Sequence, residues 1–593
     1  MDQLTPLSKR RPEEQTEAQR EQEYHMPEWA KGVVWYQIFP ERFNNGDHSN
    51  NPTGKCINAP EGWRLSPWTG DWYERADWEY KLGDKFTDGI YKRRYGGDLQ
   101  GIIDKLDYLQ DLGVEALYLN PVFDAISLHK YDTSYYHHID CFFGPDPEGD
   151  QAVIASEDPS DPDTWKWTSA DKLFLELVQK VHQRGMKIII DGVFNHTGTD
   201  FWAFRDLIEN QQQSEYRDWY VVNSFDDDKN GTSFNYEGWW GFETLPEFNQ
   251  VDGNLYEPVK HHIFEITKRW MLPEGDRDRG VDGWRLDVPE EIGKAFWREW
   301  NGWVRNIDPD AYTVGEIWSD DASEWVGKDL FSATMNYQFA ESVQNFMINE
   351  SVLLTDFLKE LDRQRSQLPQ SAPLGMQNLM DSHDTPRLAS MVVNAGLPYN
   401  KKGKPEYGFN VRKPRTQERR LQRLIALFQF TYTGAPMIYY GTEAGMWGAG
   451  DPDDRKPMVW PELDFEPERT DPLGRERLQD GNNFEPSLFR WYKQLAGLRR
   501  KYASLRKGDM KIIQSNNERQ SFVFTRKFAD EPSLIVVINR SNKTQMLGIS
   551  ADHLFREVSA RLKNVLTGNV INIIENKANI YLPPVTGAVL IQE

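Results

Sequence analysis

The sequence predicts an α/β protein: a (β/α)₈ TIM barrel with an excursion domain after the third strand and a C-terminal antiparallel β domain. Three observations lead to this fold class. Short apolar runs of strand length alternate with helical patterns through most of the chain, which is typical of parallel sheets. Eight such runs occur, and several end in carboxylates or histidines. The length of 593 residues exceeds one ordinary domain but suits a barrel with attachments.

The expected barrel strands are short and apolar. They lie at 32–40, 114–123, 186–196, 281–288, 311–318, 331–339, 376–384 and 434–443. Helical patterns separate most of them, at 98–112, 171–185, 258–271, 290–305, 351–364 and 417–431. Because helical crossovers separate most of the strands, the strands are expected to be parallel, and eight of them suggest a closed barrel.

The chain divides into five expected segments. They are a polar N-terminal arm (1–28), the first part of the barrel (29–196), an excursion domain (197–257), the rest of the barrel (258–503) and a C-terminal β domain (504–593). The connection after the third strand is far too long for a simple crossover, and it is rich in Trp, Asn, Gly and Asp. In the last segment we expect antiparallel strands at 521–528, 533–541, 564–572 and 587–593.

Composition limits the partners. The formal net charge of −23 argues against nucleic acid or an anionic membrane surface, because phosphate would be repelled. A neutral substrate fits better. The 22 Trp residues suit sugar rings, although Trp is also a large core residue. Two cysteines, Cys56 and Cys141, exclude a disulfide framework and a Cys-rich zinc site.

The sequence also bears on compartment. No run approaches the roughly 18 apolar residues of a membrane-spanning helix, so we expect no membrane insertion. The N-terminus is charged and lacks the apolar segment of a secretory signal. We therefore expect a cytoplasmic protein if Met1 is native, and a periplasmic or secreted one if a signal peptide has been removed.

The chemistry is expected at the carboxyl ends of the strands, where parallel barrels carry their active sites. Arg285 and Asp287 lie two positions apart and so share one face of the fourth strand, and Glu316 ends the fifth strand. If Asp287 and Glu316 lie at equivalent heights, their backbones are about 4.8 Å apart. That spacing approaches the roughly 5–5.5 Å between the carboxyl groups of retaining glycosidases.

The motifs "DGVFNH" (191–196), "GWRLDV" (283–288), "GEIW" (315–318) and "MDSHDT" (380–385) follow one another in this order. They resemble the four sequence regions of the α-amylase family, glycoside hydrolase family 13. "VVWYQIFPERFNNGD", "HKYDTSYYHHID" and "GWWGFETLPEFN" are similar to the neopullulanase, cyclomaltodextrinase and maltogenic amylase group. The resemblance covers roughly 28–500. Taken alone, each short motif is more often a strand-end cap or a turn, but the ordered set speaks against that interpretation.

The resemblance implies a retaining hydrolase of α-glucans such as maltooligosaccharides, cyclodextrins or starch, acting by double displacement and with possible transglycosylation. Asp287 would be the nucleophile. Glu316 would protonate the leaving oxygen and then activate water or an acceptor hydroxyl. Asp384 would hold the hydroxyls of the distorted sugar and stabilise positive charge in the transition state. Arg285 would keep Asp287 ionised.

The resemblance also implies residues that bind substrate. His196 and His383 would hydrogen-bond the sugar that precedes the cleaved bond, and Tyr131 would stack on it. Trp318, directly after the fifth strand, is expected to contact substrate. Asp191 is expected to be structural and to orient the site from beneath. Trp239 and Trp240 remain open between a sugar platform and packing of the excursion domain.

A calcium site is expected in "NNGDHSNN" (44–51), which clusters oxygen ligands after the first strand. It resembles the calcium loop of the neopullulanase group, with ligands at Asn45, Asp47, Asn50 and Asn51. Asp71 is a possible distal ligand. The alternative is a Gly/Asn turn without metal.

Two departures from that group limit the substrate prediction. The usual N-terminal β-sandwich, which helps to form dimers there, is missing before the barrel, so a monomer is favoured. "LPEFN" (245–249) differs from the usual Met-Pro-Lys-Leu-Asn, with Glu247 in place of Lys. The choice between cyclodextrins, pullulan, starch and short maltooligosaccharides stays open. The alternatives are an α-1,6-glucosidase or sucrose isomerase of the same family, and a non-catalytic relative resembling the heavy chains of amino-acid transporters.

Overall fold

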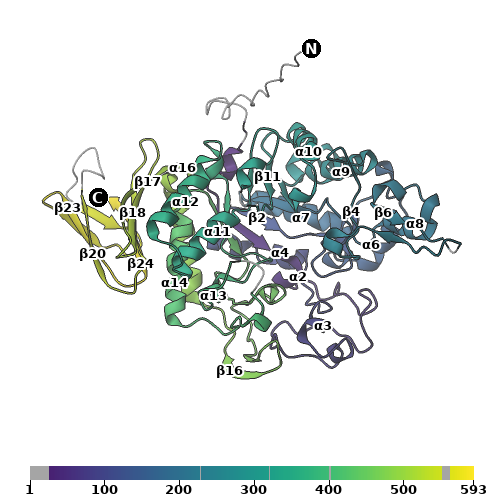
Figure 1. The fold of residues 1–593 in the computed structure, drawn as a ribbon, viewed down its shortest axis with the longest axis horizontal. Helices are drawn as coiled ribbons and strands as arrows, with labels where there is room; N and C mark the ends of the chain where they lie inside the picture. The colour runs from purple at the N-terminus through teal and green to yellow at the C-terminus, as the bar shows by residue number, and fades with distance from the viewer. Residues whose placement is uncertain (1–23, 25, 228, 320, 400–402, 551–560) are drawn as a thin grey trace, which may run out of the picture.

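A barrel of eight parallel strands forms the centre of the computed structural model, which describes residues 24, 26–227, 229–319, 321–399, 403–550 and 561–593 (Figure 1). The strands are β1 (Trp35–Ile38), β2 (Ala116–Leu119), β5 (Lys187–Gly192), β10 (Gly283–Leu286), β11 (Tyr312–Gly315), β12 (Ala333–Thr334), β13 (Gln377–Asn378) and β14 (Ala435–Tyr439). Each pairs in parallel with its neighbour in the chain, and β14 pairs with β1. A parallel bridge from Met335 to Gln377 closes the ring.

The eight strands occupy the cores of the eight predicted runs, which confirms the fold class. Barrel strands are covered on both sides, by side chains inside and by helices outside, so they read as continuous apolar runs. The exceptions are polar residues toward the carboxyl ends of the strands, such as Gln37, Asp191 and Arg285, all fully buried. In the sixth run the structure differs from the expectation: β12 ends at Thr334, and Tyr337 already begins α11 (Tyr337–Val343) because Asn336 caps its first turn.

Helices surround the barrel. The principal ones are α4 (Leu99–Asp104), α5 (Leu106–Leu112), α7 (Ser169–Gln183), α9 (Glu257–Met271), α10 (Lys294–Ile307), α12 (Leu354–Ser366), α14 (Thr416–Thr431) and α15 (Pro486–Lys501). Helix α7 shows why they form where they do. Thr168 and Asp171 make a capping box at its start, and its apolar stripe of Phe174, Leu177 and Val181 is fully buried. Among the described residues, no helix is long and apolar enough to cross a bilayer.

Two excursions leave the top of the barrel. After β2 the chain forms the antiparallel pair β3 (Phe123–Ala125) and β4 (Thr133–Ile139), and then α6 (Pro147–Ile154). After β5, residues 197–256 form α8 (Trp202–Asn210) and two small hairpins, β6–β7 (Val222–Ser224, Asn235–Tyr236) and β8–β9 (Gln250–Val251, Asn254–Leu255). Their strands are too short to hold a sheet alone, and aromatic contacts such as Phe204 on Tyr236 pack them instead.

The C-terminal domain is an antiparallel sheet of eight strands in the order β17-β18-β19-β24-β21-β22-β23-β20. The strands are β17 (Asp509–Asn516), β18 (Ser521–Lys527), β19 (Leu534–Asn539), β20 (Gln545–Ser550), β21 (Arg561–Asn564), β22 (Val570–Ile574), β23 (Lys577–Leu582) and β24 (Thr586–Gln592). The sheet lies against α12 and α14, at the left of Figure 1. The expected strand at 564–572 is wrong: this stretch contains the turn between β21 and β22, with Gly568 at φ +79°. Most of the predicted polar arm (residues 1–23 and 25) lies outside the described residues.

Candidate active site

Two predicted carboxylates lie side by side because of strand register. In the pairing of β10 with β11, Leu286 is opposite Gly315. Asp287 and Glu316 are the next residues on each strand. The Glu316 amide donates to the Leu286 carbonyl (3.0 Å), and the Asp287 amide donates to the Gly192 carbonyl (3.1 Å). The ladder therefore holds both carboxylates at the same height on neighbouring strands.

One guanidinium joins three acidic groups. Arg285 Nη1 donates to both oxygens of Asp191 (2.7 and 2.9 Å) and to Asp287 Oδ1 (2.8 Å). Its Nη2 lies 2.8 Å from Glu316 Oε2. The Arg285 side chain is 0% exposed, so these charges interact with little screening by water. Arg285 thus orients the two carboxylates toward each other, and Asp191 supports it from the neighbouring strand, as expected.

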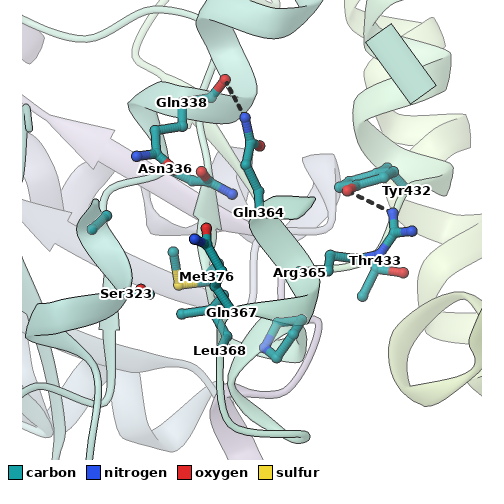
Figure 2. Close-up of a pocket in the computed structure, with 12 residues that line it drawn as sticks. Ser323, Asn336, Gln338, Gln364, Arg365, Gln367, Leu368, Met376, Tyr432 and Thr433 are labelled. Atoms are coloured by element: carbon teal, nitrogen blue, oxygen red, sulfur yellow. Dashed lines mark hydrogen bonds between the residues drawn. The ribbon is translucent and has the colours of Figure 1, made fainter. Parts of the chain in front are cut away.

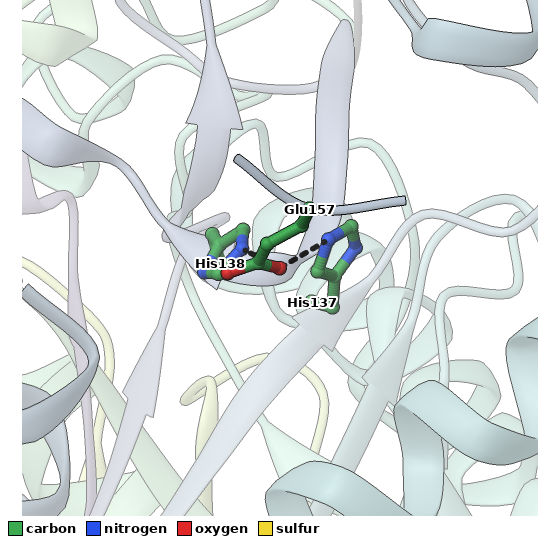
Figure 3. Close-up of side chains that lie close together, drawn as sticks. All are labelled: His137, His138 and Glu157. Carbon is green, nitrogen blue, oxygen red and sulfur yellow. Dashed lines mark hydrogen bonds and ion pairs between the residues drawn. The ribbon is translucent and has the colours of Figure 1, made fainter. Parts of the chain in front are cut away.

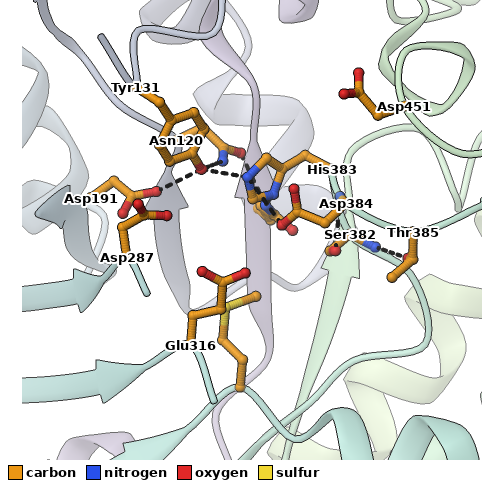
Figure 4. A network of polar contacts seen from close by, with 12 residues as sticks. Asn120, Tyr131, Asp191, Asp287, Glu316, Ser382, His383, Asp384, Thr385 and Asp451 are labelled. Carbon is orange, nitrogen blue, oxygen red and sulfur yellow. Dashed lines mark hydrogen bonds and ion pairs between the residues drawn. The ribbon is translucent and has the colours of Figure 1, made fainter. Parts of the chain in front are cut away.

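A polar network continues from Asp191 across the top of the barrel (Figure 4). Tyr131 donates to Asp191 Oδ2 (3.1 Å), and its hydroxyl also contacts His383 Nε2. The Tyr131 and His383 rings are stacked, with centroids 5.5 Å apart. Gln37 Nε2 contacts His383 Nδ1 (2.9 Å) and Asn120 Oδ1 (3.0 Å). These hydrogen bonds and ring contacts therefore hold side chains from different strands of the barrel in fixed positions relative to one another.

Asp384 completes a group of three carboxylates with Asp287 and Glu316, and Figure 4 shows the three around a common space. It follows β13 and is the most open of them, with a side chain 29% exposed. Arg455 Nη2 lies 3.4 Å from Asp384 Oδ1, and Arg455 Nε donates to the His383 carbonyl (2.8 Å). The sequence did not point to Arg455, because it lies in the irregular segment after β14.

One side chain and one backbone amide donate hydrogen bonds to the carboxylate of Glu316. Trp318 Nε1 donates to Glu316 Oε1 (2.9 Å), and the Val288 amide donates to Oε2 (3.2 Å). Val288 has φ +35°, a left-handed conformation that is unusual for a β-branched residue. The turn it makes directs its N–H at Glu316. The Trp318 ring stacks on Tyr337 at 3.7 Å, so the tryptophan is held in place between α11 and the carboxylate.

His196 lies at the boundary between the barrel and the excursion domain. It is 1% exposed, and its Nε2 has no hydrogen-bond partner among the described residues. Its ring stacks on Trp239 (5.3 Å), which stacks on the exposed Trp240 (5.3 Å). A bridge to Glu247 fixes the backbone of His196. The stack connects the catalytic end of β5 with the solvent.

Burial and crowding of negative charge shift the titration of this site. Burial raises the pKa of Asp287 well above its ordinary value; Arg285 opposes this rise, and repulsion from Glu316 and Asp191 adds to it. Burial and then repulsion from Glu316 raise the pKa of Asp384 to about 7. Burial lowers the pKa of His196 to about 3. Asp287 and Asp384 therefore lose their protons less readily than exposed aspartates do, and the histidine is neutral at neutral pH.

The expected calcium ligands are only partly brought together. Asn45 Nδ2 donates to Asn51 Oδ1 (2.9 Å), and the side-chain oxygens of Asn45 and Asn50 are buried without hydrogen-bond partners among the described residues. Asp47 Oδ1 accepts from Ser49. Asp71 is engaged elsewhere: its oxygens accept the amides of Tyr73 (3.0 Å) and Arg469 (2.8 Å).

One acidic residue at the loop was missed. Asp98 accepts the amides of Gly46 (3.1 Å) and Asp47 (2.8 Å) and the Nδ2 group of Asn50 (3.1 Å). In the sequence it reads as the N-cap of the following helix, which it also is, because it accepts from Gly101. Gly96 and Gly97, which precede Asp98, were the available sign that this segment packs closely on the loop. A Cβ added to Gly96 would lie 2.0 Å from Asn51 Oδ1.

A separate pocket lies at the C-terminal ends of α12 and α14 and carries none of the predicted site residues (Figure 2). It is lined by neutral polar groups such as Asn336, Gln338 and Gln364, together with Arg365, whose guanidinium donates to the Tyr432 hydroxyl (2.8 Å). No aspartate, glutamate or histidine lines it. The carboxylates around Arg285 are therefore the stronger candidate for chemistry.

Comparison with known proteins agrees with this geometry. A model of the α-amylase catalytic domain matches residues 37–155 and 168–508. The chain belongs to the α-amylase family. Neopullulanase 2 of Thermoactinomyces vulgaris is 37% identical over 528 residues, covering 89% of this chain and 73% of that protein. A cyclomaltodextrinase of Geobacillus thermopakistaniensis is 33% identical, covering 95% of this chain and 77% of its own length.

Solved structures place this α-amylase-family chain in the same way. Cyclic α-maltosyl-(1→6)-maltose hydrolase from Arthrobacter globiformis superposes with a TM-score of 0.69 at 26% identity, covering 96% of this chain and 100% of that one. The expected family and fold are confirmed, and the chain is a glycoside hydrolase acting on α-glucans.

Asp384→Asn is expected to raise thermal stability at alkaline pH. The pKa of Asp384 in the folded state, about 7, exceeds the unfolded value of about 3.9. The folded chain therefore binds the proton more tightly, and its stability falls as the pH rises between these values. An asparagine at this position cannot ionise, so the variant does not lose this stability as the pH rises. Its melting temperature should exceed that of the original chain by a few degrees at pH 8.

The same comparison at pH 4 serves as the control, because the carboxyl group is then largely protonated in the folded chain. Melting curves at both pH values should show the difference at pH 8 alone. Equal melting temperatures at pH 8 would contradict a raised pKa for Asp384.

Proposed function

We propose that this chain hydrolyses α-1,4-glucosidic bonds by double displacement with retention of configuration. Asp287 is the nucleophile, Glu316 the general acid and base, and Asp384 the group that holds the sugar hydroxyls. The observation that carries this assignment is the single guanidinium of Arg285 in contact with both Asp287 and Glu316. Two carboxylates that contact one guanidinium from neighbouring strands suit the short separation of roughly 5–5.5 Å that retaining glycosidases use.

In the first step Asp287 Oδ attacks the anomeric carbon while the glycosidic C–O bond breaks. Glu316 gives its proton to the departing oxygen, and a β-glucosyl ester forms on Asp287. In the second step Glu316 takes a proton from water, the water oxygen attacks the anomeric carbon, and the ester bond to Asp287 breaks. An acceptor sugar hydroxyl in place of water gives transglycosylation. Arg285 stabilises the negative charge on Asp287 in the first and last stages.

The residues around the carboxylates support binding of one pyranose at this point. We assign His196 as a hydrogen-bonding partner of its hydroxyls, because its buried Nε2 has no partner among the described residues. We assign His383 to the same sugar, because its Nε2 lies 3.3 Å from Asp384 Oδ2. Tyr131, held by Asp191 and His383, offers its ring to the sugar. Trp318 lies beside the leaving-group side of Glu316, and Trp239 and Trp240 extend the aromatic surface outward.

For substrate, we propose cyclomaltodextrins and short maltooligosaccharides. The support comes from the relatives called neopullulanase and cyclomaltodextrinase and from the exposed aromatic rings of Trp240 and Phe242, which are 64% and 56% exposed. Such rings suit a curved or short glucan that stacks at the mouth of the site. An α-1,6-acting enzyme is the second candidate, because one solved relative is called a cyclic α-maltosyl-(1→6)-maltose hydrolase.

A product profile separates these candidates. With β-cyclodextrin, pullulan, soluble starch and maltotriose at equal mass, we expect the highest initial rates on β-cyclodextrin and maltotriose, measured as reducing ends and by chromatography of the products. Faster release from an oligosaccharide with only α-1,6 bonds, such as isomaltotriose, would contradict the α-1,4 assignment. No release from any of these glucans would contradict the proposed function as a whole.

Asp287→Asn is expected to lower kcat on the order of 10⁴-fold or more, because the variant cannot form the ester. Melting temperature should change little. Proton NMR of the first product formed by the original chain should show the α-anomer, as retention requires. A β-anomer as first product, or turnover by Asp287→Asn within about tenfold of the original, would show that Asp287 is not the nucleophile.

Glu316→Gln provides the matched variant. Because α-glucosyl fluoride needs no protonation of its leaving group, the variant should form the ester from this substrate far faster than from maltotriose. Asp287→Asn should be slow on both. Equal losses on the two substrates in Glu316→Gln would contradict the role of Glu316 as the acid.

We also propose that the 44–51 loop binds Ca²⁺ through oxygens of Asn45, Asp47, Asn50 and Asn51. The buried unpartnered oxygens of Asn45 and Asn50 suit a hard cation, and the adjacent carboxylate of Asp98 supplies negative charge. Asp71 is left out, because backbone amides already occupy both of its oxygens. A bound cation would stabilise the loop and takes no part in the reaction steps.

Removing calcium with excess chelator is expected to lower the melting temperature by several degrees and to change kcat little below the transition, because the ion stabilises the folded chain alone. Calcium should restore the original value. Asp47→Asn should weaken the response to calcium. An unchanged melting temperature with chelator present would contradict the site.

A further inference from the structure

A second group of metal-binding side chains lies outside the catalytic site, and Figure 3 shows it. His137 and His138 come from β4, and Glu157 comes from the segment that follows α6. Their ligand atoms all lie within 4.8 Å of one another. The three side chains are each no more than 1% exposed. The match to the family model stops at residue 155 and resumes at 168, so Glu157 lies outside the matched residues.

Consecutive residues of a regular strand point to opposite faces, yet both histidines reach the same carboxylate. The pairing of β3 with β4 explains this. Phe123 pairs with Ile139, whereas the next residue, Asp124, pairs with Tyr135. Residues 136–138 are thus left over as a bulge, and bulges are a means of redirecting side chains toward a site. The two imidazole centroids lie 4.4 Å apart as a result.

The distances suit a tetrahedral ion. His138 Nε2 lies 3.2 Å and His137 Nε2 3.8 Å from Glu157 Oε2. Ligand bonds of about 2.0–2.1 Å to zinc place neighbouring donor atoms about 3.3 Å apart in a tetrahedron. Two neutral imidazole nitrogens and one carboxylate, with a fourth position for water, form a common zinc ligand set.

The surroundings orient each ligand. Asp171 Oδ2 contacts His138 Nδ1 (2.9 Å), so Nε2 faces the other two ligands; carboxylates hold metal-bound histidines in this manner. The Lys166 amide donates to Glu157 Oε1 (3.0 Å), which leaves Oε2 toward the histidines. Trp165 stacks on His137 with centroids 4.4 Å apart. Each ligand therefore has its own positioning contact.

We propose that His137, His138 and Glu157 bind a divalent transition metal ion of the zinc type. The ion ties the segment after α6 to β4. The same strand carries Tyr136, whose hydroxyl donates to the His196 carbonyl (2.8 Å), and it begins two residues after Tyr131. The metal is thus structural, and it supports the wall of the glucan site from behind without contact with substrate.

The competing explanation is an ion pair without metal. His138 lies between Asp171 (2.9 Å) and Glu157 (3.2 Å), so this pair would form without His137. That explanation gives no role to the adjacent His137. Its Nε2 lies 3.8 Å from Glu157 Oε2, too far for a hydrogen bond, and its Nδ1 has no hydrogen-bond partner within the described part of the chain.

The test is titration of the full-length, chelator-treated protein with Co²⁺ and with Zn²⁺ while calcium is kept saturating. We expect one equivalent of Co²⁺ to give the intense visible absorption of tetrahedral cobalt, Zn²⁺ to displace it, and the melting temperature to rise with either ion. Glu157→Gln and His137→Gln should each weaken binding by roughly 100-fold. His261→Gln is the matched control, because His261 is a helix histidine 73% exposed, and it should bind as the original chain does.

Two results would overturn the proposal. One is the lack of any tetrahedral cobalt spectrum in the original chain, which does not depend on whether a variant folds. The other is stoichiometric zinc that remains in both Glu157→Gln and His137→Gln, because the ion would then lie elsewhere. Glucan hydrolysis should persist in the metal-free protein at moderate temperature, so this test stands apart from that of the proposed function.

Discussion

The contact of one buried arginine with three carboxylates is the interaction on which the rest of this site depends. Arg285 cannot lose its charge, and it lies fully inside the barrel. A buried charge is tolerated only where opposite charges meet it with good geometry, and Asp191, Asp287 and Glu316 do so. One positive charge faces three acids, and repulsion from Glu316 and Asp191 adds to the effect of burial in raising the pKa of Asp287. The same excess of acids makes the site costly to fold.

That interaction exists only because the barrel closes. Asp191 is opposite Arg285 in the pairing of β5 with β10, and Asp287 and Glu316 directly follow the paired residues Leu286 and Gly315 of β10 and β11. Tyr131 and His383 then continue the contacts toward the strand pair β13 and β14. A change of register by one residue would turn every one of these side chains to the helical side. The fold and the chemistry are therefore specified by the same backbone hydrogen bonds.

Much of this was predictable from the sequence, since the information is local. Apolar runs gave the eight strands, and a carboxylate directly after such a run must lie at the active end of a parallel barrel. Long-range contacts were not predictable in this way. Nothing near Arg455 indicates that it reaches Asp384, and Asp98 reads equally well as a helix cap. The run 564–572 has apolar residues of high strand propensity on both sides of its centre, but Gly568 at positive φ makes it a hairpin. The pairing of His137 and His138 depends on a bulge that alternation of residues conceals.

The backbone pairing of His196 with Glu247 has a consequence for engineering. The Thr197 amide donates to the Pro246 carbonyl (3.1 Å), and the Phe248 amide donates to the Asn195 carbonyl (3.0 Å). Backbone hydrogen bonds therefore join the excursion domain to the residues that follow β5. Grafting this module wholesale from another hydrolase would also move His196, the residue that we propose hydrogen-bonds the sugar. Laboratory evolution of substrate selectivity is better directed at single exposed side chains of the excursion domain, such as Trp240. Substitutions there leave these backbone hydrogen bonds intact.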